Sequence, residues 1–132
     1  MSIRSATLGF LLTVTTLVLG ACANNPLSVA ETASQRGYAI ESAYNIILED
    51  ALAVASAPQT TPEVRQRIQA AEASATPIIG SMSDTLAAFE VERAKFDAGQ
   101  STQEKVSVVA ANLTSWIDRA KAALINLQTA FR

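Results

Sequence analysis

Residues 102–131, TQEKVSVVAANLTSWIDRAKAALINLQTAF, contain the widest apolar stripe of this chain. Apolar side chains recur there at steps of three and four residues, which places them on one face of an α-helix. The stripe consists of Val106, Val109, Leu113, Trp116, Ile117, Ala120, Leu124, Leu127 and Phe131. Such a stripe is buried against other helices, so the segment predicts one long helix of a bundle.

The same spacing upstream predicts two further helices, over about 28–57 and 62–98. The first stripe consists of Ala30, Ala33, Gly37, Ile40, Tyr44, Ile47, Ala51 and Val54. The second consists of Val64, Ile68, Ala71, Ala75, Ile78, Met82, Leu86, Phe89 and Phe96. Alanine is abundant and only five glycines occur, a composition that also favours helix.

Each predicted helix begins with a capping pattern, in which a hydroxyl residue is followed three positions later by a carboxylate. The patterns are SVAE at 28–31, TTPE at 60–63 and STQE at 101–104. In the second, Pro62 suits the first helical position, so Thr61 is the expected cap. Three such patterns, each opening an apolar stripe, indicate three helix starts.

Pro58 is expected to end the first helix, and Gly99 is expected to close the second in a left-handed conformation. The links at 58–61 and 99–101 are short, and short links make successive helices antiparallel neighbours. The sequence therefore predicts an all-α, up-down-up three-helix antiparallel bundle over 28–132.

Pro77 is the one interruption inside the second predicted helix. Proline removes a backbone hydrogen bond and its ring clashes with the preceding turn. Two outcomes are open: the helix kinks at Pro77, or it breaks there, with Thr76 capping a fourth helix.

Composition narrows the function classes. Without residues 1–21, and hence without Arg4, nine basic residues (10 − 1) face twelve acidic ones. That balance argues against a nucleic-acid partner. The chain has no histidine and a single cysteine, so we expect no metal site and no other cofactor.

No catalytic site is expected. Glu90 and Glu92 are the closest approach to a carboxylate pair, but they lie about 200° apart around a helix and cannot converge on one substrate. The nucleophile-elbow, phosphate-loop and calcium-loop motifs are absent from the sequence. We therefore expect a protein that is not an enzyme.

Binding residues are suggested by position. Trp116 lies on the apolar stripe and is expected in the core; the alternative is that it lines a pocket opened by a kink at Pro77. Tyr38 is expected on the outside, available to a partner. The link residues Pro58, Gln59, Thr60 and Thr61 form the other candidate partner surface, together with the chain terminus.

The first 25 residues indicate export. A start containing Arg4 precedes an uncharged apolar run at 6–19 and then the small residues Gly20, Ala21, Cys22 and Ala23. This order is typical of a secretory signal. Cleavage after Ala23 would release a soluble protein, and an uncleaved membrane anchor is a further alternative.

The stretch Leu19, Gly20, Ala21 and Cys22 resembles the lipobox of bacterial lipoproteins. That resemblance implies cleavage between Ala21 and Cys22, a diacylglycerol on the Cys22 thiol and an acyl group on its amine. It divides the chain into a signal peptide at 1–21, a short lipidated tether at 22–27 and the bundle at 28–132. The bilayer is then one partner, reached through the acyl anchor.

The residue after Cys22 is Ala23 and not aspartate. By what is known of lipoprotein sorting, this resemblance implies delivery to the inner leaflet of the outer membrane, facing the periplasm. The segments GYAIESAYNI and SATPII resemble small alanine-rich lipoproteins of phages and prophages, which implies lysis or superinfection exclusion. Resemblance to secretin pilotins implies escort of an outer-membrane protein. Other expectations are self-association, or carriage of a small apolar ligand between helices.

Overall fold

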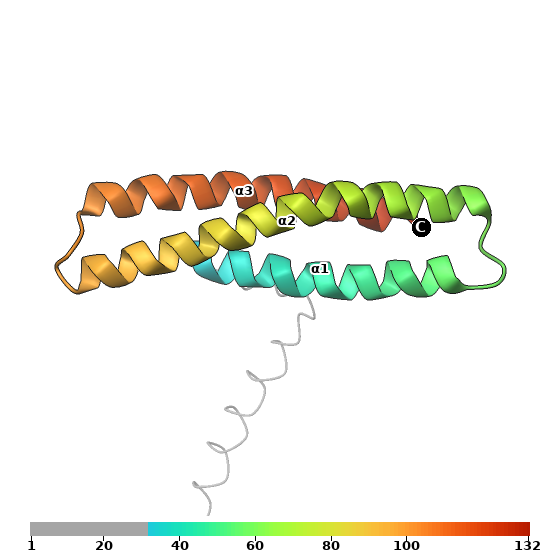
Figure 1. The fold of residues 1–132 in the computed structure, drawn as a ribbon, viewed down its shortest axis with the longest axis horizontal. Helices are drawn as coiled ribbons and strands as arrows, with labels where there is room; N and C mark the ends of the chain where they lie inside the picture. The colour runs from blue at the N-terminus through green and yellow to red at the C-terminus, as the bar shows by residue number, and fades with distance from the viewer. Residues whose placement is uncertain (1–31) are drawn as a thin grey trace, which may run out of the picture.

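The computed structural model describes residues 32–132, and this part of the chain is a bundle of three α-helices without β-strands. The helices are α1 (Ala33–Ser56), α2 (Pro62–Asp97) and α3 (Gln103–Ala130). Each helix packs against the other two, most extensively α2 against α3. Figure 1 shows them side by side, joined by short turns at opposite ends of the bundle. The predicted three-helix antiparallel bundle is confirmed.

The start of α1 differs from the prediction. Thr32 has an extended backbone, so no helix runs from 28 through this residue. Its side chain accepts a hydrogen bond from the Gln35 backbone N–H (3.2 Å), and the Gln35 side chain accepts one from the Thr32 N–H (2.9 Å). This reciprocal capping box satisfies two free donors at the helix end. The predicted start at 28 was wrong, and SVAE at 28–31 lies outside the described residues.

Both ends of α2 follow the prediction. The Thr61 hydroxyl accepts from the Val64 N–H, and Pro62 occupies the first turn. Gly99 has φ +71°. Its N–H donates to Phe96 O (2.9 Å), while the Gln100 N–H donates to Lys95 O (2.7 Å). These two bonds form the left-handed motif that satisfies the last carbonyls of a helix.

The cap of α3 is Thr102, one residue after the predicted Ser101. The Thr102 hydroxyl accepts from the Lys105 N–H. Ser101 instead donates its hydroxyl hydrogen to a carboxylate oxygen of Glu92, across the turn. The predicted Ser101 cap was wrong because this longer-range bond occupies the Ser101 side chain.

Pro77 does not divide α2, which is one continuous helix (Figure 1). The predicted alternative of a break, with a fourth helix capped by Thr76, was wrong. The Thr76 hydroxyl donates back to Glu72 O (2.9 Å), as it does inside a helix. Thr76 Oγ1 also lies 2.9 Å from the Tyr44 hydroxyl, and because its own hydrogen is used, Tyr44 is the donor. α2 is thus bonded to α1 one residue before the proline.

The core follows the predicted stripes in two clusters. The larger comprises Ile40, Ile79, Met82, Leu86, Phe89, Leu113, Ile117, Ala120 and Leu124. The smaller, towards the α1–α2 turn, comprises Ala51, Ile68, Leu127 and Ala130. Ile79 is buried although it was not on the predicted stripe, and Phe96 is 38% exposed although it was.

Contact between Gly37 and Leu86 sets the register of α1 against α2. A β-carbon added at Gly37 would lie 2.9 Å from Leu86 Cδ2, so the two helices are in contact there. Counting along antiparallel helices, Ala33 is level with about residue 90, and α2 continues roughly 10 Å further at 1.5 Å per residue. Figure 1 shows this end of the α2–α3 hairpin extending past the start of α1. We call residues 91–109 the overhang.

Candidate functional site

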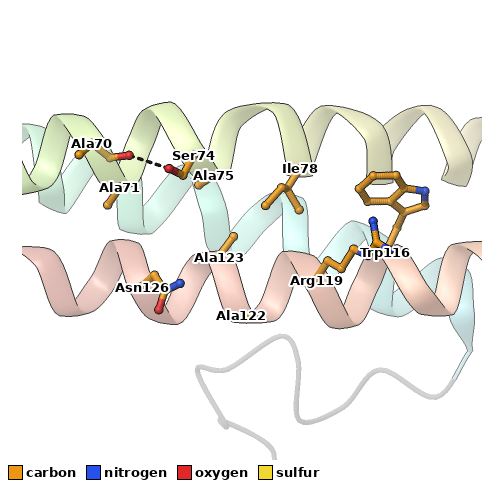
Figure 2. A pocket seen from close by; sticks show the side chains of 10 residues that line it. All are labelled: Ala70, Ala71, Ser74, Ala75, Ile78, Trp116, Arg119, Ala122, Ala123 and Asn126. Atoms are coloured by element: carbon orange, nitrogen blue, oxygen red, sulfur yellow. Dashed lines mark hydrogen bonds between the residues drawn. The ribbon is translucent and has the colours of Figure 1, made fainter.

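A groove of about 670 Å³ lies between α2 and α3. Its lining residues are Ala70, Ala71, Ser74, Ala75, Ile78, Trp116, Arg119, Ala122, Ala123 and Asn126. Figure 2 shows α1 behind these two helices, so the groove faces the side that α1 does not cover. The space exists because small residues recur on both helices where larger ones would fill it.

Trp116 forms one end of the groove, with Arg119 beside it (Figure 2). The indole is half-buried and packs against the larger core cluster. The Arg119 guanidinium carbon lies 4.9 Å from the centroid of the Trp116 ring, a favourable cation–π distance. Within residues 32–132 no carboxylate pairs with Arg119; the neighbouring Asp118 pairs instead with Lys121 (4.0 Å). The groove therefore combines an apolar floor with one cation at its rim.

The structure places the two predicted pocket residues, Trp116 and Pro77, differently. Trp116 lines the groove, but Pro77 is exposed and does not, although its neighbour Ile78 does. Arg119 was not among the binding residues predicted from the sequence. Its spacing of three residues from Trp116 on a predicted helix was the signal that could have found it, since residues three apart share a helix face.

The predicted partner residues lie at opposite ends of the bundle. Tyr38 is 53% exposed near the start of α1. Pro58, Gln59 and Thr61 are exposed in the α1–α2 turn. Tyr38 and this turn are separated by about 28 Å of helix, so they cannot form one small site.

Thr60 is the exception within the α1–α2 turn, because its side chain is turned inward. Its hydroxyl donates to Val54 O at 2.5 Å, and its N–H donates to Ala57 O at 3.1 Å. Arg65 Nη2 also donates to Ala57 O (3.2 Å). These bonds fix the backbone of the turn, so Pro58, Gln59 and Thr61 present a preorganised surface.

The acidic residues near the end of α2 serve local structure. Glu92 accepts the Ser101 hydroxyl and lies 3.8 Å from Lys95 Nζ. At the start of the same helix, hydrogen bonds from its own backbone N–H and from Thr61 lower the pKa of Glu63 below its usual value. Within residues 32–132 no three His, Cys, Asp or Glu side chains group closely enough to hold a metal ion.

Ala21 and Cys22, the predicted cleavage and lipidation residues, lie outside the described residues. None of the helices within 32–132 combines the length and hydropathy needed to cross a membrane. Comparison of the chain with protein-family models, curated proteins and solved structures gives no match in any of the three.

Proposed function

We propose that this protein is a lipid-anchored helical bundle that acts through protein contacts in the bacterial cell envelope and not through catalysis. One observation carries the proposal: the only cysteine, Cys22, follows Leu19, Gly20 and Ala21 directly after an uncharged apolar run. A free thiol is a liability in an oxidising compartment, and alkylation removes it. Two or more acyl chains anchor stably, because each buried CH₂ contributes about 0.8 kcal/mol.

The fold suggests where a protein partner would bind. α1 leads away from the anchored end for 24 residues, about 36 Å of helix. The α1–α2 turn with Pro58, Gln59 and Thr61 is therefore distal to the bilayer, as is the end of α3. The roles implied by resemblance, a phage or prophage envelope function or escort of an outer-membrane protein, both need such a presented surface.

Intact-mass measurement of the protein purified from membranes tests the anchor. We expect wild type to begin at Cys22 and to carry acyl mass, and Cys22→Ala to keep its leader and carry none. The double variant Cys22→Ala/Ser56→Cys restores an exposed thiol outside the motif and should also stay unacylated. An unmodified Cys22 thiol in the wild-type protein would refute the anchor.

A second candidate function, carriage of a small amphiphile, is favoured by the α2–α3 groove. Its volume of about 670 Å³ lies within the range of small-molecule sites, about 300–1,000 Å³. The apolar floor suits a hydrocarbon tail, and the unpaired Arg119 suits an anionic head.

Titration with dodecanoate, followed by Trp116 fluorescence, tests the carrier function. Ala122→Leu fills the groove from an exposed position and should abolish the fluorescence change. Ala111→Leu, also exposed on α3 but outside the groove, should leave it intact. An unchanged response in Ala122→Leu would exclude the groove as the site.

A further inference from the structure

Exposed apolar side chains gather in the overhang. Val91 is 54% exposed, Phe96 38% and Val108 60%. These are three of the seven large apolar side chains exposed in residues 32–132, yet the overhang comprises only residues 91–109. The hairpin end therefore offers apolar side chains to a surrounding apolar environment, although they do not form one flat patch.

The three side chains point in different directions around the hairpin end. Val91 and Phe96 are five residues apart, which places them about 140° apart around α2 at 100° per residue. Phe96 continues the core stripe past the start of α1, whereas Val91 lies on the outer side. A protein partner or a second copy would contact one face, but a lipid environment can surround a helix end on all sides.

The overhang is also at the correct end of the bundle. Nine residues lie between Cys22 and Thr32, and the ten residue steps that join the two span at most roughly 33–36 Å. The overhang extends only about 10 Å past the start of α1. A lipid anchor at Cys22 therefore leaves room for the overhang to reach the same bilayer.

The tip of the overhang suits an interface. Residues 98–103, AGQSTQ, carry no charge. Asp97 and Glu104 flank this tip directly, and Lys95 and Lys105 lie beyond them; all four are exposed. Lysine can lay its apolar stem along the acyl region while its ammonium group stays among the headgroups.

We propose that the overhang inserts Val91, Phe96 and Val108 into the interface of the bilayer to which Cys22 is anchored. This inference rests on the proposed lipid anchor. The bundle then has two attachments to the membrane, the acylated Cys22 and the hairpin end. It stands on its α2–α3 turn and presents the α1–α2 turn to the periplasm.

Depth-dependent quenching tests the insertion. Lipidated protein carrying Trp116→Phe, with either Phe96→Trp or Ile125→Trp, is reconstituted into vesicles whose phosphatidylcholine acyl chains are brominated. We expect emission from the residue-96 variant to fall at least about twofold, because interfacial segments lie roughly 5–10 Å into the headgroup and acyl boundary. Ile125 is 62% exposed but lies about 33 Å along α3 from the turn, so its variant should not be quenched.

The outcomes separate this inference from the anchor. If the protein floats with vesicles and the two variants are quenched equally, the inserted overhang is refuted and the anchor stands. A molecular mass that rises with protein concentration in sedimentation would then indicate that a second copy of the chain covers the overhang. If the lipidated preparation fails to float with vesicles, both the anchor and the insertion fall.

Discussion

At Gly37 the backbone of α1 lies against the side chain of Leu86, which is buried. The second helical glycine, Gly80, has no atom within 4 Å of the position that a β-carbon would take. Both residues have helical backbones, so alanine should raise helix propensity equally at the two positions, by about 0.8–1.0 kcal/mol. Packing alone distinguishes them.

We therefore expect Gly80→Ala to increase the free energy of unfolding by roughly 1 kcal/mol. Gly37→Ala should instead lower the free energy of unfolding, because overpacking a core costs about 1–3 kcal/mol. Urea unfolding of the two variants measures the contrast. Equal stabilisation at both positions would mean that Leu86 moves aside freely and that the close α1–α2 contact does not set the register.

The helix α2 contains two prolines, one at its start and one in its interior. Pro62 is in the first turn, where a backbone N–H would have no acceptor within the helix, so its absence costs nothing. The fixed φ of proline also matches the helical value there. Pro77 is in the interior, where it lacks the N–H that would bond the Ala73 carbonyl. The helix continues through Pro77 because packing against α1 and α3 holds both of its halves.

Pro77→Ala should stabilise the protein by up to about 3 kcal/mol, the cost of an interior proline. Pro62→Ala should destabilise it slightly, by less than about 1 kcal/mol, through the unfolded chain. The two midpoints of urea unfolding should move in opposite directions. A shift of the same sign at both positions would contradict this account of α2.

The unequal lengths of the helices make the two ends of the whole molecule differ in local stability. α1 has 24 residues and α2 has 36, so the hairpin end consists of two helices where the rest of the bundle has three. Val106 and Val109 are only half-buried there, whereas Leu113, beside α1, is fully buried. Regions with fewer buried contacts open more readily.

Hydrogen exchange of the protein without vesicles should show this difference. We expect the amides of 91–97 and 103–109 to exchange faster than those of 113–127, which lie beside α1 and the core clusters. The slow amides of 113–127 serve as the internal reference. Equal protection in both regions would indicate that something covers the overhang in solution.

The groove and the overhang could be predicted from the sequence only in part. Trp116 could be selected from the sequence because it is a rare aromatic residue on a periodic stripe. The alanines near it form a groove because of the way α2 packs against α3, which the sequence does not show. Likewise Phe96 was placed on the buried stripe by its period, and its exposure depends on where a different helix begins.

The sequence alone is enough to predict the antiparallel arrangement, the Thr61 cap and the Gly99 stop. These features depend on side chains within about four residues of one another, and such local energies can be read along the chain. Packing across the bundle decides the continuity of α2 through Pro77, and with it the presence of three helices and not four in residues 32–132. It also decides the bond from Ser101 to Glu92 and the overhang. Each of these depends on which distant residues meet, as Gly37 meets Leu86, and that register is set by packing across helices and not by periodicity within one.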